Sequence, residues 1–403
     1  MTMPDLAIVG GGAAGISAAR EARKRGLTVV ILEASDRTGG RTYTIDWKGH
    51  ALDLGATWMH SADRNPLAAL AQQLGVAIDR APARWRNQYK NLRYSQEEQA
   101  QSWAAMEAFA ERLRSGPRED RASEALEPGN EWNGFLEALN GYLNGTSLNK
   151  TSAADFAAYW DGSDNTNWRL PKGYGGLVSM LAEGLDVRVH CAVQRIDWGA
   201  TVRLTTGQGT VEAAYAIITV PTNVLSRGDI AFSPGLDDHL HAAAQLPLGH
   251  VEKLFFESED PDSMPLNAHL IGDPHSADTG SYMLQPLGMP VVEGFFGGDW
   301  LADMDEEALA EKGRQELGNV LGSDFVRKLR PVAFSDWRTH AFICGSYSYA
   351  RPGQHGARAA LRAAVDGPLA FAGEACSDTD YATVHAAWTS GIGAVAQLFG
   401  SAP

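Results

Sequence analysis

The sequence has few cysteines, few basic residues for its length and no long apolar run. Its three cysteines, Cys191, Cys344 and Cys376, lie far apart in no Cys-x-x-Cys pair, so we expect neither a disulfide framework nor a metal site. The 34 lysines and arginines face 49 acidic residues, a net charge of −15, which excludes the extended basic surface of a nucleic-acid-binding protein. No stretch reaches the ~20 apolar residues that span a bilayer. We therefore expect a cytoplasmic protein with no metal, nucleic-acid or membrane partner.

The remaining composition is that of an ordinary globular protein with one excess, glycine. Hydrophobic residues make up 44% and charged residues 21% of the chain, which excludes extensive disorder. At ~150 residues per domain, the 403 residues predict two or three packed units. The 43 glycines predict many tight turns or close backbone approaches. The acidic excess suits a cationic ligand, although excess carboxylates ordinarily serve solubility.

The N-terminal segment has the pattern of a dinucleotide-binding βαβ unit. Residues 6–9 predict a short buried strand, which is followed by a glycine-rich run at 10–15 and a helical run to Arg25. A second strand at 28–32 ends at Glu33, so the unit fits within the ~30 residues that this fold requires. Because both strands and the helix surround the glycines, the segment predicts a dinucleotide site rather than a structural turn.

Each role in such a unit can be given to one residue of this chain. Gly10 makes the tight turn, Gly12 lets the backbone approach a pyrophosphate, and Gly15 lets the helix pack on the strand. The free N–H groups and the dipole of the helix N-terminus stabilise the phosphates. Glu33, eighteen residues after Gly15, is placed to accept hydrogen bonds from a ribose.

Later segments predict a helical insert and a second domain. Helix-like runs at 95–114 and 132–143 fall in an insert of residues 79–168. Strands are predicted at 187–189, 193–196, 202–204, 216–220, 251–256, 291–296 and 369–373, and helices at 305–321 and 384–399. The strands between 187 and 220 are expected to form a small antiparallel meander that returns to the main sheet. The predicted class is α/β, with a discontinuous dinucleotide-binding domain (1–78, 169–240 and 338–403) and an α+β substrate domain (79–168 and 241–337) that carries the helical insert.

Six separated blocks carry a resemblance to a known family. They are Ile8 to Gly15; Leu32 to Ala34 with Gly39 to Thr42; Asp53 to His60 with Asn65 to Leu67; Pro171 to Val178; Gly345 to Tyr349; and Phe371 to Glu374 with Ala382 to His385. Together they resemble the flavin-containing amine oxidases, the family of monoamine and polyamine oxidases and the related histone lysine demethylases. The first two blocks also occur in other flavoproteins, including carotenoid desaturases and porphyrinogen oxidases.

The resemblance implies a Rossmann-like FAD-binding domain in a glutathione-reductase-like architecture. Arg41 would contact the phosphates and the flavin edge, Val193 the adenine, and Glu374 the ribityl chain. The Val384 N–H, at the start of the last helix, would face the pyrimidine edge of the flavin. The full set of implied cofactor-binding residues is Gly10, Gly12, Ala14, Gly15, Glu33, Ala34, Gly40, Arg41, Ala56, Thr57, Val193, Glu374 and Val384. The FAD is expected to be non-covalent, because Ser346 stands where enzymes with covalent flavin carry a cysteine.

Two residues match the catalytic positions of the family. Lys253 matches the lysine that holds a water against the flavin N5, although a lysine on an edge strand is ordinarily a surface residue. Tyr347 matches one aromatic wall of the amine cage. On the opposite wall, monoamine oxidases carry a second tyrosine where this chain has Thr383. The implied substrate pocket comprises Trp58, His60, Trp337 and Thr383, with core packing as the alternative role for the tryptophan at 337 and the histidine.

The resemblance implies oxidation of an amine C–N bond to an imine, which is hydrolysed to an aldehyde or ketone, with O2 reduced to H2O2. The implied partners are a small-molecule amine and O2, and a homodimer is one option for the oligomeric state. One alternative is an L-amino-acid oxidase; Trp58 replaces the arginine of that class, but Arg84, Arg86 or Arg93 could supply another guanidinium. A carbon-centre desaturase or oxidase and a non-catalytic flavin-binding protein also stay open.

Overall fold

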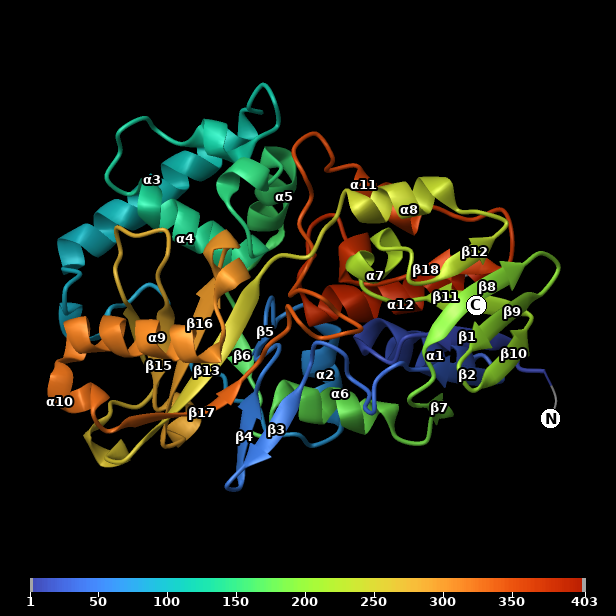
Figure 1. Ribbon diagram of the computed structural model, residues 1–403, viewed down its shortest axis with the longest axis horizontal. Coiled ribbons are helices and arrows are strands. Elements are labelled where there is room, and N and C mark those ends of the chain that lie inside the picture. Colours follow the sequence, from blue (N-terminus) through green and yellow to red (C-terminus); the bar gives the residue numbers. More distant parts are fainter. Residues whose placement is uncertain (1–2, 401–403) are drawn as a thin grey trace.

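A five-stranded parallel sheet forms one half of the molecule, on the right of Figure 1. The computed structural model describes residues 3–400. The strand order is β18 (Leu369–Phe371), β11 (Tyr215–Ile218), β1 (Leu6–Val9), β2 (Val29–Leu32) and β7 (Val187–Arg188). Every neighbouring pair of strands is parallel. Leu6 of β1 lies opposite Val29 of β2 on one side and opposite Tyr215 of β11 on the other. This order brings the first and last strands of the chain into one sheet.

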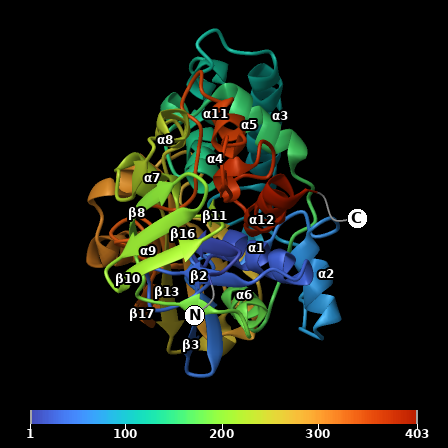
Figure 2. The same ribbon diagram turned by 90° about the vertical axis from the view of Figure 1, so that its right-hand side faces the viewer.

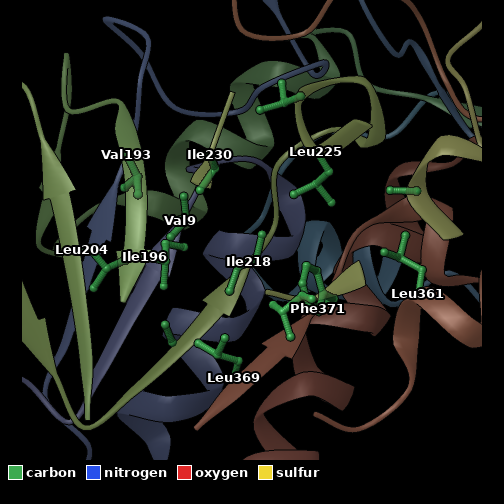
Figure 3. Close-up of a cluster of buried hydrophobic side chains, with 14 of the residues drawn as sticks. Val9, Val193, Ile196, Leu204, Ile218, Leu225, Ile230, Leu361, Leu369 and Phe371 are labelled. Atoms are coloured by element: carbon green, nitrogen blue, oxygen red, sulfur yellow. The ribbon is translucent and has the colours of Figure 1, made fainter. Parts of the chain in front are cut away.

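Both faces of the parallel sheet are covered, so its strands are apolar on both sides. Leu6 and Ile8 face the paired helices α1 (Ala13–Lys24) and α12 (Val384–Phe399), which are adjacent in both views (Figures 1 and 2). Ala7 and Val9 face the opposite way, into the cluster of Figure 3. That cluster is closed by a four-stranded sheet, β10 (Gly209–Ala213), β9 (Val202–Thr206), β8 (Val193–Trp198) and β12 (Ala231–Ser233), and by α7 (Thr222–Ser226), α8 (Asp237–Ala244) and α11 (Ala357–Arg362).

An antiparallel sheet forms the other half, on the left of Figure 1. Its order is β14 (Ala268–Ile271), β15 (Ser281–Leu284), β16 (Val291–Gly297), β13 (Val251–Ser258) and β17 (Leu329–Phe334). The side chains alternate between its two faces. Leu254 and Phe256 pack under α9 (Glu306–Leu321), which is followed by α10 (Ser323–Val326), whereas Lys253 and Glu293 lie on the other face.

The insert of residues 79–168 is mainly helical and lies beside the antiparallel half, at the upper left of Figure 1. Its helices α3 (Gln96–Arg114), α4 (Asn133–Asn144) and α5 (Ala153–Gly162) share one core, which includes Phe109, Phe135 and Phe156. Ser95 and Glu98 form a capping box at the start of α3, since each side chain accepts the backbone N–H of the other residue. Short 3-10 turns occur at Tyr89–Asn91, Ala122–Ala125, Leu148–Lys150, Pro261–Ser263, Pro286–Gly288, Asp299–Asp303 and Glu374–Cys376.

The predicted α/β class is confirmed, and so are the βαβ unit, the helices α3 and α4 of the insert and the antiparallel pairing of β8 with β9. The third strand of the meander, β10, and the third helix of the insert, α5, were not expected. One detail of the meander was wrong, because Val187–Arg188 hydrogen-bonds to β2 and extends the parallel sheet. Several elements were not expected: β14, β15, β17, the hairpin of β3 (Thr44–Trp47) and β4 (His50–Asp53), the pair β5 (Trp58–Met59) and β6 (Trp168–Arg169), and helices α2 (Pro66–Gln73) and α6 (Tyr174–Ala182). The hairpin turns at Lys48 and Gly49, which both have positive φ, as a type I′ turn requires.

None of the helices within residues 3–400 combines the length and the apolar character needed to cross a membrane.

Candidate functional site

One cavity of about 900 Å³ lies between the parallel and the antiparallel sheets. All the site residues named from the sequence line it except Gly15: Gly10, Gly12, Ala14, Glu33, Ala34, Gly40, Arg41, Ala56, Thr57, Trp58, His60, Val193, Lys253, Trp337, Tyr347, Glu374, Thr383 and Val384. We call the part lined by the 10–15 loop, Glu33, Arg41, Glu374 and Val384 the glycine end. The part lined by Lys253, Glu293, Phe295, Tyr347 and Trp337 is called the lysine end.

The glycine end is formed by the turn between β1 and α1. Helix α1 begins at Ala13, so its first N–H groups have no intrahelical acceptor. A Cβ added to Gly12 would meet no protein atom within 4 Å, whereas a Cβ on Gly15 would lie 2.0 Å from the Gly10 carbonyl oxygen. Gly12 therefore borders open space beside a helix N-terminus. Gly15 is required for packing, which explains why it does not line the cavity.

Glu33 closes the glycine end at the tip of β2. Its Oε2 accepts the Gly11 N–H at 2.6 Å, and its Oε1 accepts the Ser35 N–H at 2.7 Å. The side chain is buried yet borders the cavity. A carboxylate offers about four lone-pair sites, so each oxygen keeps one acceptor position for a ligand hydroxyl.

The half-buried Arg41 and the buried Glu374 form an ion pair that joins the first and last parts of the chain, with Nη1 2.9 Å from Oε1. Glu374 also accepts the Ser348 N–H at 3.1 Å and the Ala382 N–H at 2.9 Å. Burial alone would raise the pKa of Glu374, but Arg41 and Arg358 outweigh burial and hold the pKa below its ordinary value. Glu374 is therefore a carboxylate at neutral pH.

The N-terminus of α12 also borders the cavity. Thr383 is its N-cap: the hydroxyl accepts the Ala386 N–H at 3.2 Å and donates to the Asp380 carbonyl at 2.6 Å. Val384 is the first helical residue, so its N–H has no intrahelical acceptor. Two helix N-termini, those of α1 and α12, thus contribute positive dipole ends to the same cavity.

Lys253 is buried on the wall made by β13. Its ammonium lies 3.0 Å from the Asp53 carbonyl oxygen and 2.9 Å from Glu293 Oε1, and it donates to Thr57 Oγ1. The adjacent Asp53 carboxyl accepts the Tyr174 N–H at 3.0 Å. Burial raises the pKa of Asp53 to about 6, with the charge of Lys253 opposing and that of Glu293 adding to the shift. Lys253 thus lies inside the cavity on a central strand and not on the surface of an edge strand.

Aromatic side chains enclose the lysine end. The Tyr347 hydroxyl donates to the Tyr142 carbonyl on α4, and burial raises the pKa of Tyr347 well above its ordinary value, so it stays a neutral donor. The Trp337 indole N–H donates to the Leu54 carbonyl at 3.0 Å. Each ring is thereby fixed by a hydrogen bond to the backbone, and the ring faces are left for apolar contact.

Trp58 and His60 lie further along the same wall. The Trp58 ring meets Trp85 edge-on at 4.8 Å between centroids, and the Arg169 guanidinium lies 4.7 Å from the Trp58 ring centre. His60 Nδ1 is 2.7 Å from Asn167 Oδ1, and burial lowers the pKa of His60 to about 4. His60 is therefore neutral at physiological pH.

Sequence reasoning missed many residues of the lysine end: Trp85, Trp103, Glu107, Tyr142, Tyr159, Trp160, His269, Ser281, Met283, Glu293 and Phe295. Most come from the helical insert or from β14 and β15, for which no site motif was recognised. Glu293 and Phe295 carried a usable signal, because both alternate with apolar residues in the predicted 291–296 strand. Of the three arginines considered for a substrate carboxylate, only Arg86 lines the cavity, exposed and 4.3 Å from the Trp103 ring centre.

The residues of the glycine end fit a flavin dinucleotide. The open space at Gly12 admits a pyrophosphate, the N-termini of α1 and α12 stabilise negative charge, and Glu33 retains acceptors for a ribose.

Comparison with known proteins agrees with this geometry. Residues 79–399 match the family model of the flavin-containing amine oxidoreductases, and residues 8–74 match an NAD(P)-binding Rossmann-like domain. Polyamine oxidase 2 of Arabidopsis thaliana is 29% identical over 440 residues, covering 96% of this chain and 86% of that protein. Lysine-specific histone demethylase 1B of Mus musculus is 27% identical over 430 residues, and this chain spans 52% of its length.

Solved structures of two amine oxidases share the fold. Putrescine oxidase bound to putrescine aligns with a TM-score of 0.82 at 20% identity, covering 99% of this chain and 100% of that one. Cyclohexylamine oxidase from Brevibacterium oxydans IH-35A aligns with a TM-score of 0.80 at 20% identity, covering 98% and 99%. The match of the family model to most of the chain shows that this protein belongs to the flavin-containing amine oxidoreductases and that it is a flavin-dependent enzyme of amine oxidation.

Proposed function

We propose that the protein uses non-covalent FAD to oxidise the C–N bond of a small-molecule amine, with O2 as the electron acceptor and H2O2 as a product. The observation that carries the proposal is that a single cavity joins a dinucleotide cradle to an aromatic wall that contains a buried lysine paired with a carboxylate. The polyamine, putrescine and cyclohexylamine oxidases among its relatives support an amine as substrate.

The glycine end would hold the cofactor. The N–H groups at Gly12 and Ala14 would bind the pyrophosphate, Glu33 the adenosine ribose, and Arg41 the phosphates and the flavin edge. Val193 would contact the adenine, and Ala34 and Gly40 would also contact the cofactor. Ala56 and Thr57 would hold the ring by backbone contacts, Glu374 would lie by the ribityl chain, and the Val384 N–H would face the pyrimidine edge.

The lysine end would hold the amine. When bound, the flavin supplies the redox chemistry, taking a hydride equivalent from the amine α-carbon and passing the electrons to O2. Tyr347 and Trp337 would present aromatic faces that orient an amine and exclude water. Lys253 would hold a water beside the flavin, while Trp58, His60 and Thr383 would complete the outline of this part of the cavity.

The proposal of a non-covalent cofactor rests on Ser346. This side chain lines the cavity at the position where a cysteine would be needed for a covalent link, and its hydroxyl has no hydrogen-bond partner among the described residues. Acid precipitation of the purified protein should therefore release all the yellow colour into the supernatant. Colour retained in the pellet would contradict the non-covalent assignment.

The first experiment mixes the purified protein anaerobically with a panel of primary amines, secondary amines and polyamines. The absorbance of oxidised flavin at about 450 nm is monitored after mixing. Bleaching by at least one amine, with recovery of the colour and peroxide formation on admission of air, is the expected result. Yellow protein that no amine bleaches would overturn the assigned substrate class.

The panel should include α-amino acids, because Arg86 borders the cavity and could meet a carboxylate. Arg86 is exposed and stacks on Trp103, however, so we expect plain amines to be oxidised faster than amino acids. The cytoplasmic location and the homodimer stay predictions from the sequence.

A further inference from the structure

A buried ion pair joins the helical insert to the half that carries the parallel sheet. Asp155 lies on α5 and Arg358 on α11, two helices that are neighbours in both views (Figures 1 and 2). The pair is bidentate, with Nε 2.6 Å from Oδ1 and Nη2 2.8 Å from Oδ2, and both side chains are buried. The guanidinium also lies 3.6 Å from the centre of the Tyr381 ring. Neither Asp155 nor Arg358 lines the cavity, so any role of this pair in the site has to act through other residues.

Ser348 connects Arg358 to the cavity wall. Its Oγ lies 2.9 Å from Arg358 Nη1 and 2.7 Å from Glu374 Oε2. A guanidinium can only donate a hydrogen bond and a carboxylate can only accept one. The Ser348 hydroxyl therefore accepts from Arg358 and donates its single hydrogen to Glu374. Arg358 fixes the direction of this hydrogen bond, because without it the hydroxyl is free to turn away from the carboxylate.

Glu374 has no acceptor position left over for a ligand. A carboxylate offers about four lone-pair sites. On Oε1 they are filled by Arg41 Nη1 at 2.9 Å and the Ser348 N–H at 3.1 Å. On Oε2 they are filled by the Ser348 hydroxyl at 2.7 Å and the Ala382 N–H at 2.9 Å. Glu374 thus holds together three segments of the chain that border the cavity: the one with Arg41, the one with Tyr347 and the one that precedes α12.

Arg41 is the member of this network that presents donors to the cavity. Its Nη1 donates to Glu374 and, at 2.7 Å, to the Ser346 carbonyl. Within residues 3–400, Nε and Nη2 of Arg41 have no hydrogen-bond partner, and the side chain borders the cavity. Arg41 and Arg358 together hold the pKa of Glu374 below its ordinary value, so the carboxylate stays charged and keeps Arg41 beside it. The donors that Arg41 retains for a ligand are therefore oriented by Glu374.

We propose that Arg358 and Asp155 are positioning residues for the cofactor, which act through Ser348 and Glu374 to direct the Arg41 guanidinium at the phosphates of FAD. This inference rests on the proposed FAD site and extends it to two residues outside the cavity. It also makes cofactor binding depend on the helical insert, because α5 supplies Asp155.

The test is titration of the flavin-free protein with FAD. Arg358→Met should weaken FAD binding by at least ~10-fold, the lower end of the range for a hydrogen bond to a charged group. Arg358→Lys, which keeps a positive charge and a donor for the Ser348 hydroxyl, should bind FAD at least ~threefold more tightly than Arg358→Met. In an Arg41→Met background, Arg358→Met should weaken FAD binding by less than about twofold further, because the side chain that it positions is already gone.

A second variant keeps the test informative if Arg358→Met does not fold, since that change leaves Asp155 buried without its cation. Ser348→Ala retains the ion pair between α5 and α11 and should weaken FAD binding by about three- to tenfold. The control is Asp161→Asn, which breaks an exposed pair with Arg114 on the same helix as Asp155 and should change FAD affinity by less than about twofold. Unfolding curves of the flavin-free variants show which of them are folded before titration.

Three outcomes would overturn the inference. The first is wild-type FAD affinity in folded Arg358→Met or Ser348→Ala, and the second is an Arg358→Lys protein that binds FAD no better than Arg358→Met. The third is an equal loss from Arg358→Met with and without Arg41, which would mean that Arg358 supports the fold as a whole. Each of these leaves the proposed FAD site standing, whereas a wild type that binds no FAD would overturn both.

Discussion

The two ends of the cavity are built by different means. At the glycine end, the binding groups are mainly backbone N–H groups and turns within a 30-residue segment, and the ionic groups there are paired or hydrogen-bonded by the protein. At the lysine end, the wall is made of side chains from strands and helices more than 100 residues apart, and one oxygen of the partly buried Glu293 carboxylate has no hydrogen-bond partner among the described residues. The first end suits a constant ligand, and the second can change its ligand by single substitutions.

This difference between the two ends predicts that the largest losses of stability follow when one charge of the lysine end is removed without its partner. Lys253→Met leaves the partly buried Glu293 without its cation, and breaking a pair that is largely removed from water costs about 3–5 kcal/mol of unfolding free energy. The double variant Lys253→Met/Glu293→Gln should recover most of that loss, because neither charge remains. Denaturant unfolding of the three proteins measures both effects.

The matched control is Lys48→Met, which breaks the exposed pair with Glu257 and should change the unfolding free energy by less than about 1 kcal/mol. If Lys253→Met were no more destabilising than Lys48→Met, the carboxylate of Glu293 would not depend on its lysine. The contrast between the two ends would then lose its physical basis.

Two glycines of one loop test the glycine end. Gly15→Ala should destabilise the protein by about 3 kcal/mol, since its Cβ would lie 2.0 Å from a backbone oxygen that cannot move aside. Gly12→Ala should leave the unfolding free energy of the flavin-free protein within about 0.5 kcal/mol, because its Cβ meets no protein atom. The same substitution should weaken FAD binding at least ~10-fold, since the methyl group enters the space assigned to the pyrophosphate.

Flavin titration of the stripped proteins and their unfolding curves separate these two effects. Wild-type FAD affinity in Gly12→Ala would show that the pyrophosphate lies elsewhere in the cavity. Gly12→Ala and Gly15→Ala serve as controls for each other, because each adds one methyl group and the two positions are three residues apart.

This division also explains what the sequence could predict. The glycine end was predictable because its geometry is local: the Gly10 turn, the start of α1 and Glu33 follow from one short pattern. The roles given to the glycine-end residues by family resemblance stay predictions, although their side chains and backbone do line the cavity.

The lysine end was only partly predictable, because it depends on pairing between distant strands. Lys253 could be named from its match to the family position, but its pairing with Glu293 could not, since the register of β13 against β16 is set by packing against α9 and not by any local pattern. For the same reason β14 and β15, which supply His269 and Met283, were not expected.

The buried histidines of the lysine end predict a loss of stability in acid. Burial holds the pKa of His269 near 4, against 6.5 for an unperturbed histidine, so between these values the unfolded chain binds a proton that the folded chain does not. The stabilisation is complete above pH ~6.5, and about 2 kcal/mol of it is lost at pH ~5. His60 contributes in the same direction. Asp53 acts oppositely, because its raised pKa makes the folded chain bind more protons in this window.

The measurement is the unfolding free energy of the wild type and of His269→Gln at pH ~8 and pH ~5. The wild type should lose about 2 kcal/mol more than the variant between the two conditions. Parallel losses would mean that His269 is protonated in the folded protein, and the wall around Glu293 would then contain a second positive charge.

The smallest predicted effect is that of removing one hydroxyl from the aromatic wall. Tyr347→Phe loses the hydrogen bond to the Tyr142 carbonyl, which also leaves that acceptor to find another partner, at a cost of about 1 kcal/mol in unfolding free energy. The aromatic face remains, so the rate of flavin reduction by an amine at saturation should stay within about threefold of the wild type. Tyr347→Leu, which removes the face as well, should slow that reduction by roughly tenfold or more. If Tyr347→Phe were as slow as Tyr347→Leu, the hydroxyl and its link to α4 would be what orients the amine, and the lysine end would depend on polar contacts in the way the glycine end does.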